Sequence, residues 1–197
     1  FPVSVGNNFF YTLSLPCSLW FFDKAKREEN RDKVLFIDAR KYYTVVDRTL
    51  NEWTEWQLLN LQAIVHLYRG ETDKYQALLG KYNHDISEAV NSISEEAQLF
   101  ASLLDDETAG QFNSSLAWLG SPWNNYDELS KNLNGQIEQT KACIKLAEEK
   151  LKKRELKAMR LAGDRFCNVL EEILTIIEEY NWLTEKFGNG EYQDIAG

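Results

Sequence analysis

The segments GNNFFYTLSLPCSLWFFDK (residues 6–24) and KVLFIDARK (residues 33–41) are rich in apolar and aromatic residues and flank the charged loop KAKREENRD (residues 24–32). Short, continuous apolar runs bounded by charges are typical of strands buried on both faces. Strands of that kind need neighbours within a larger sheet. We therefore expect the chain, which begins at Phe1, to be the back end of a longer protein.

Two strands are predicted, over residues 17–23 and 33–39. The loop between them is polar and longer than a tight turn, so antiparallel pairing of the two strands is possible. Residues 1–11 contain Pro2 and Gly6 and are predicted to be a loop that leads into the first strand. The local structure of residues 40–52 is left open by the sequence.

A helix is predicted from about residue 54 to Tyr68. Thr54 and Gln57 have the spacing of a capping box, apolar residues then recur at helical spacing, and Gly70 ends the pattern. His66 lies on this helix without a second His or Cys at ligand spacing, so a structural role is expected for it.

From Thr72 onward the chain is predicted to be helical. Apolar residues advance in steps of three and four, which is typical of a bundle or coiled coil. The three seams cover residues 86–104, 126–151 and 166–187. We place the join between the last two helices near residues 152–155, and a short helix around residues 112–119 across the bundle. Trp118 and Trp123 are expected to anchor the core.

Composition restricts the functional classes. The chain has a formal net charge of −9, which argues against autonomous DNA binding, so any DNA contact must be local or supplied by a partner. No apolar run is long enough to span a bilayer and no signal peptide is visible, which favours a cytoplasmic protein. Cys17, Cys143 and Cys167 are far apart in apolar surroundings and are expected to be reduced, buried thiols; no metal site is visible.

Three phrases in order carry a family resemblance. NNFFYTLSLPCSLWFFDK (7–24), VLFIDARKYYT (34–44) and IVHLYRGE (64–71) resemble the carboxy-terminal part of the methylation (M) subunit of type I restriction-modification systems. That family methylates the exocyclic amino group of adenine in DNA with S-adenosylmethionine. The resemblance implies a mainly α fold, in which a two-stranded remnant of a Rossmann-like methyltransferase sheet (residues 1–70) precedes long antiparallel assembly helices (residues 71–197).

The resemblance also implies a contact with the target base. An adenine must be flipped out of the duplex and held between flat side chains before its amino nitrogen can be methylated. By its position before CSLWFF, the segment Phe9–Phe10–Tyr11 resembles the second stacking element of this family, with Phe10 as the best match and Phe9 or Tyr11 as alternatives. The competing interpretation is that Phe9 and Phe10 fill the domain core.

The catalytic motifs of the family are missing from these 197 residues. The sequence contains neither an Asn-Pro-Pro-aromatic loop nor a glycine-rich strand-to-helix turn that could hold the methyl donor. We therefore expect S-adenosylmethionine to be a cofactor of the parent protein only, and the chain alone to have no catalytic residues and no activity.

The resemblance implies that the carboxy-terminal helices dock the specificity (S) subunit, and through the complex the restriction (R) subunit and DNA. Self-association is a further possibility. Thr140 and Gln136 dilute the apolar stripe of one helix, which fits a partner-facing role, but an internal bundle explains the seams equally well. The candidate assembly residues are Tyr126, Leu129, Leu133, Ile137, Ile144, Leu151, Ile173 and Ile176. The alternative function is a stand-alone helical interaction module without a methylation role.

Overall fold

The computed structural model describes residues 1–10, 14–148, 150–188 and 190. The chain divides into two compact units. Unit 1 contains Phe1–Leu79 and Asn181–Gly197, and unit 2 contains Gly80–Tyr180. None of the helices in the described ranges is both long and apolar enough to cross a membrane.

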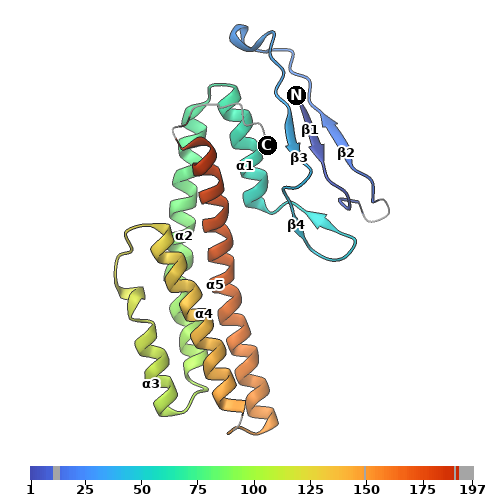
Figure 1. The fold of residues 1–197 in the computed structure, drawn as a ribbon. Helices are drawn as coiled ribbons and strands as arrows, with labels where there is room; N and C mark the ends of the chain where they lie inside the picture. The colour runs from blue at the N-terminus through green and yellow to red at the C-terminus, as the bar shows by residue number, and fades with distance from the viewer. Residues whose placement is uncertain (11–13, 149, 189, 191–197) are drawn as a thin grey trace. The chain divides into compact units, whose positions relative to one another are not determined.

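Unit 1 begins with a three-stranded sheet (Figure 1). Strand β1 (Pro2–Val5) lies between β2 (Cys17–Trp20), to which it is antiparallel, and β3 (Ile37–Ala39), to which it is parallel. The prediction of a loop over residues 1–11 was therefore wrong, as was the direct pairing of the two later strands. The polar connection of residues 21–36 is long enough to cross β1, so the first strand takes the central place.

The two faces of this sheet differ. Val3 pairs with Ile37 and Val5 with Ala39, and all four side chains are buried. Val3, Ile37 and Ala39 belong to a core against which Leu61, Ile64 and Val65 pack. Side chains alternate between the faces of a strand, and the opposite face carries Trp20 and Phe36, which are 64% and 72% exposed. The prediction that both faces are buried was wrong within this chain, because the second face carries the exposed Trp20 and Phe36 together with the polar residues Ser4, Ser18 and Asp38.

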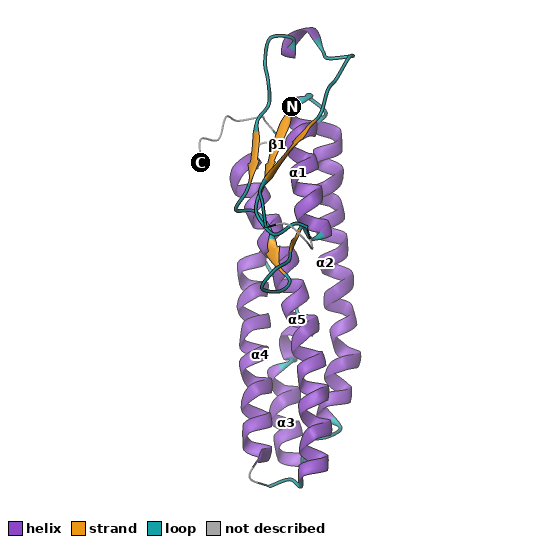
Figure 2. Cartoon of the chain, turned by 90° about the vertical axis from the view of Figure 1, so that its right-hand side faces the viewer, coloured by secondary structure: helices purple, strands orange, loops and turns teal. Residues whose placement is uncertain are grey.

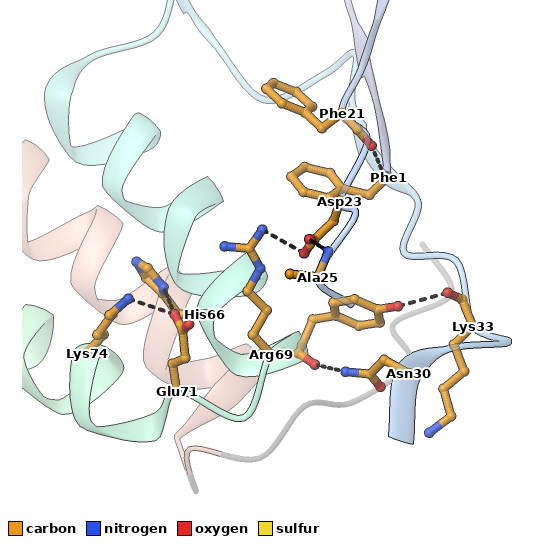
Figure 3. A network of polar contacts seen from close by, with 11 residues as sticks. Phe1, Phe21, Asp23, Ala25, Asn30, Lys33, His66, Arg69, Glu71 and Lys74 are labelled. Atoms are coloured by element: carbon orange, nitrogen blue, oxygen red, sulfur yellow. Dashed lines mark hydrogen bonds and ion pairs between the residues drawn. The ribbon is translucent and has the colours of Figure 1, made fainter. Parts of the chain in front are cut away.

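The charged loop is held by polar contacts, which Figure 3 shows. It contains the 3₁₀ turn η1 (Glu28–Asn30), where Asn30 Nδ2 donates to Tyr68 O at 2.7 Å. The Tyr68 hydroxyl donates to Lys33 O at 2.9 Å, and Arg69 pairs with Asp23 at 3.4 Å. These contacts fasten the connection between β2 and β3 to the end of the following helix.

Residues 40–52 form a short hairpin of β4 (Thr44–Val45) and β5 (Asn51–Glu52). It leads into helix α1 (Glu55–Tyr68). The predicted capping box is present, since Gln57 N donates to Thr54 Oγ1 at 3.2 Å while the Gln57 side chain accepts from Thr54 N at 3.1 Å. The helix stops before Gly70, which has a φ of 68° that glycine adopts without strain.

Unit 2 is a bundle of helices (Figure 2). Its described elements are most of α2 (Thr72–Ala101), α3 (Asp106–Ser115), the 3₁₀ turn η2 (Ala117–Gly120), α4 (Tyr126–Glu148) and most of α5 (Lys153–Phe187). Helices α2, α4 and α5 cover most of the predicted seams, and the join between α4 and α5 lies between Glu148 and Lys153, slightly before the predicted residues 152–155. The short helix lies lengthwise beside α4, not across the bundle as predicted, because it begins at the Asp105 cap and continues through Gly110.

The core of unit 2 is aromatic at one end, where Phe100, Phe112 and Phe166 pack with ring centroids 5.0–6.4 Å apart. Gln136 and Thr140 lie inside this bundle, 1% and 0% exposed. These two polar side chains therefore belong to the interior of the bundle, and the partner-facing role predicted for part of the 126–151 helix stays a prediction.

The two tryptophans expected to anchor the core, Trp118 and Trp123, are only partly buried at its edge. They contribute to the packing of the bundle without forming its centre.

Candidate functional site

The segment that follows β1 is held in one conformation by the hairpin. Asn51 N donates to Asn8 O at 2.7 Å, and Asn51 Nδ2 donates to Asn7 O at 2.9 Å. Asn8 has a φ of 62°, a left-handed conformation that Asn tolerates better than most residues. Asn51 is itself buried, so these hydrogen bonds are shielded from water. The segment is thus a fixed projection from the sheet.

Phe9 is the inner residue of this segment. Its ring centroid lies 4.7 Å from that of Trp53 and 5.9 Å from that of Tyr43. Trp53 is fixed in turn, because its Nε1 donates to Tyr42 O at 2.6 Å. For Phe9 the structure favours the packing interpretation.

Phe10 is the outer residue, with 47% of its surface exposed. The backbone of Phe10 is held in place through the packing of Phe9, while the ring of Phe10 is exposed to solvent. An exposed ring of this kind can stack on a flat ligand. Tyr11, the third candidate, lies outside the described residues. The two adjacent phenylalanines therefore differ: Phe9 packs against other aromatic rings, and Phe10 is exposed.

A cleft of about 900 Å³ lies beside this segment in unit 1. Gly6 and Asn7 follow β1 and Arg40 and Lys41 follow β3 on its wall, so the cleft reaches the carboxyl ends of the two parallel strands. Ligands of open α/β sheets bind at such an edge. Other residues on its wall are Phe36, Arg40, Lys41, Tyr42, Tyr43, Ile64, Trp182 and Lys186.

The floor of the cleft contains a stacked aromatic pair. The rings of Tyr42 and Trp182 are 4.7 Å apart with an interplanar angle of 19°. The hydroxyl of Tyr42 accepts a hydrogen bond from Nδ2 of the fully buried Asn60 at 3.0 Å. This bond fixes the orientation of the ring, so the pair is pre-organised.

Charge in the cleft is predominantly positive. Arg40 binds Asp38 through Nε at 2.9 Å and Nη2 at 2.6 Å. These hydrogen bonds, together with a smaller contribution from Lys41, lower the pKa of Asp38 to about 2. Asp38 is the single carboxylate among the described residues that line the cleft, where Arg40, Lys41 and Lys186 supply cations.

His66 has the structural role expected for it. Its Nδ1 lies 2.7 Å from Glu71 Oε2, and Lys74 Nζ lies 2.9 Å from the same oxygen (Figure 3). Hydrogen bonds from Lys74 and then His66 lower the pKa of Glu71 to about 2. The contacts of Glu71 with His66 and Lys74 connect α1 to α2 and stabilise the turn between them.

All three cysteines are free thiols. Cys143 and Cys167 are buried as expected, and burial raises the pKa of both thiols. Cys17 is only partly buried, because it lies on the edge strand β2. The two buried thiols are therefore poor nucleophiles.

The candidate assembly residues fall into two groups. Leu129, Leu133, Ile137 and Ile173 are buried in the core of unit 2, whereas Tyr126, Ile144, Leu151 and Ile176 are partly buried against it. A different set of apolar side chains points outward from unit 2. Each of them is more than 40% exposed: Leu99, Leu103, Leu146 and Leu161. Periodicity identified the seam but could not identify these outward residues.

Sequence reasoning did not find the cleft. Arg40, Lys41 and Tyr42 lie directly after a predicted strand, which was an available signal. Trp182 is about 140 residues away in sequence, and nothing in its own helical pattern indicates that it stacks on Tyr42.

Comparison with known proteins gives three findings. The profile of the family described as N-6 DNA Methylase matches residues 3–97. A curated relative, the type I restriction enzyme MjaIX methylase subunit of Methanocaldococcus jannaschii, is 48% identical over 46 residues, which are 23% of this chain and 8% of that protein. No solved structure matches.

The match to the family covers the sheet, the aromatic segment, α1 and most of α2. These are the regions that carry the three phrases quoted from the sequence. Residues 3–97 are therefore similar to the N-6 DNA methylases, and a 46-residue stretch of the chain is similar to the methylase subunit of a type I restriction enzyme.

Proposed function

We propose that this chain is the carboxy-terminal part of the modification subunit of a type I restriction-modification system. Its parent transfers a methyl group from S-adenosylmethionine to N6 of adenine in DNA. The observation that carries the proposal is the pair Phe9 and Phe10, an anchored and an exposed aromatic ring on a fixed segment after β1. That pair lies within the residues that match the N-6 DNA methylase family.

In this proposal unit 1 is one end of a methyltransferase sheet. The open face with Trp20 and Phe36 supports it, because exposed apolar patches of this kind mark surfaces that pack against other protein. The remaining catalytic domain would cover this face and supply the methyl donor site and the groups that polarise the adenine amine. The chain alone contributes neither and is inactive.

Phe10 would stack on the flipped adenine. Base–aromatic stacking contributes about 1–3 kcal/mol and requires an accessible ring whose position is already fixed. Phe10 is accessible, and the packing of Phe9 on Trp53 together with the hydrogen bonds of Asn51 supplies the fixed position.

Unit 2 would dock the specificity subunit, which brings the restriction subunit and DNA into the complex. The buried seam residues shape the bundle, so direct contact falls to its outward apolar side chains, of which Leu146 and Leu161 are 58% and 55% exposed. Leu146 lies on α4 and Leu161 lies on α5, and a short connection joins these two helices. Similarity to a type I methylase subunit supports this assignment.

The decisive experiment replaces Phe10 in the methylase subunit that contains this chain, assembled with its specificity subunit. With a duplex that carries 2-aminopurine at the target adenine, Phe10→Ala should slow single-turnover methylation by about 5- to 150-fold and leave more 2-aminopurine fluorescence unquenched. Duplex affinity should change little, because phosphate contacts persist.

Phe10→Tyr is the matched control, since it keeps a flat ring at the same place and should retain most of the activity. Equal methylation rates for Phe10→Ala and the unchanged protein would reject the stacking role. Absence of methylation by the unchanged complex would reject the function itself.

A further inference from the structure

We propose that the cleft at the carboxyl ends of β1 and β3 binds the DNA backbone of the strand that carries the flipped base. This inference rests on the proposed function and adds a second contact surface to it. Asn7 lies two residues before Phe9 and is on the wall of the cleft. A DNA strand whose base stacks on Phe10 would therefore continue toward the cleft.

The first argument is electrostatic. The whole chain has a net charge of −9, yet three of the four charged side chains among the described residues on the cleft wall are cations. Asp38 is already neutralised by Arg40, with Nε and Nη2 of the guanidinium at 2.9 and 2.6 Å from the two carboxylate oxygens. Lys41 is exposed and has no carboxylate within ion-pair distance among the residues described.

The second cation of the cleft is Lys186, on the last turn of α5. Its Nζ lies 3.8 Å from Glu185, a neighbour on the same helix and a long contact for an ion pair. Lys41 and Lys186 therefore offer ammonium groups from two elements that are distant in sequence. Phosphate groups of a nucleic-acid backbone are the polyanion that such a pair of cations fits.

The third argument is the aromatic floor. Proteins that hold single-stranded nucleic acid combine a positively charged groove with aromatic rings on which bases stack. Tyr42 and Trp182 supply such rings, and the hydrogen bond from Asn60 holds one of them in place. An acidic protein segment would use the cations but would gain less from a rigid aromatic pair, so nucleic acid is the occupant that the cleft favours.

The test is an NMR titration of the full 197-residue chain with a single-stranded deoxyhexanucleotide at low salt. A short oligonucleotide keeps the long-range repulsion by the acidic chain small. The indole signal of Trp182 and the amides of residues 40–43 should shift in a saturable way. The indole signals of Trp118 and Trp123, which belong to unit 2, should stay unchanged and serve as internal references.

Matched variants separate a local contact from general charge. Lys41→Gln and Lys186→Gln each remove one cation from the cleft, and Lys131→Gln removes one from an exposed position of α4 in unit 2. Each of the two cleft variants should weaken binding about threefold or more and reduce the slope of log affinity against log salt by about 0.7. The Lys131 variant should affect neither.

Three outcomes would overturn the proposal: no shift at Trp182, equal weakening by the cleft variants and Lys131→Gln, or equal binding of a glutamate-rich peptide of the same charge. The result is independent of the Phe10 test, which measures methylation by the assembled parent. If the cleft test fails and the Phe10 test succeeds, the proposed function stays intact and the cleft proposal is rejected. If the cleft binds the oligonucleotide but Phe10→Ala methylates normally, the stacking role is rejected and the cleft remains a nucleic-acid site.

Discussion

The ring of Phe9 packs against that of Trp53 with centroids 4.7 Å apart, while the adjacent Phe10 is 47% exposed. Phe9→Ala should therefore lower the free energy of unfolding of unit 1 by about 1–3 kcal/mol, less than the value for a fully buried Phe, because the side chain is only half-buried. Phe10→Ala should leave the melting temperature almost unchanged. Thermal unfolding of both variants checks this, and a larger loss for Phe10 would reverse the two roles.

The Glu71 cluster predicts an acid-sensitive turn. Contacts with Lys74 and His66 lower the pKa of Glu71 from 4.5 to about 2 in the folded chain. The stabilisation is therefore complete above pH 4.5 and is lost as the pH falls toward 2. Melting temperatures measured between pH 5 and about 2 should fall less steeply for Glu71→Gln than for the unchanged chain. Asp38 titrates in the same range in both proteins, so parallel curves would contradict the prediction.

Gly163 is a packing requirement of unit 2, where a Cβ would lie 2.6 Å from Ile144 Cδ1 and 3.1 Å from Phe100 Cε2. Gly163→Leu should destabilise unit 2 by about 1–3 kcal/mol through overpacking. Gly135 lies on α4 with open space around it, so Gly135→Ala should stabilise the helix by about 0.5–1 kcal/mol. Chemical denaturation measures both, and equal effects would show that the close approach at Gly163 is not maintained in solution.

Different residues of unit 2 are expected to determine its folding stability and its binding to the specificity subunit. Ile173 is 1% exposed, and Ile173→Ala should cost about 2–5 kcal/mol of folding stability. Leu161 is 55% exposed, so Leu161→Glu should melt almost like the unchanged chain but reduce co-purification with the specificity subunit. Full co-purification of both Leu161→Glu and Leu146→Glu would show that docking uses another surface.

The isolated chain should not bind S-adenosylmethionine. Its sequence has no glycine-rich strand-to-helix turn and no Asn-Pro-Pro-aromatic loop to hold the donor beside an adenine. Isothermal titration of the donor into the chain should give only heats of dilution. Saturable binding in the micromolar range would mean that the donor site includes residues of this chain.

Local patterns allowed the helices to be predicted from the sequence. Thr54 and Gln57 close the capping box as expected, and the join after α4 lies next to its predicted place. Helical hydrogen bonds and caps connect residues three or four positions apart, so periodicity and end residues contain the required information. The family relationship was equally accessible, because its phrases lie in contiguous stretches within residues 3–97.

Strand order was decided only by the tertiary structure. β1 was predicted as a loop because Pro2 and Gly6 are residues typical of loops, and its four residues are too few to show a strand pattern of their own. Its two partners are separate segments further along the chain. Pairing across such distances depends on which surfaces can be buried together, and this is not encoded in any short window. For the same reason the sequence could not show that one face of the sheet is open.

The sequence by itself determined the helical architecture, the similarity of residues 3–97 to N-6 DNA methylases and the short aromatic segment worth testing. Only the tertiary structure decided which ring of that segment is an anchor, because Trp53 and Tyr43 reach Phe9 from beyond β3. It also brought Trp182 onto Tyr42 and turned Gln136 inward. Such contacts depend on the direction of each side chain once distant elements pack, and a one-dimensional pattern carries no information about that direction.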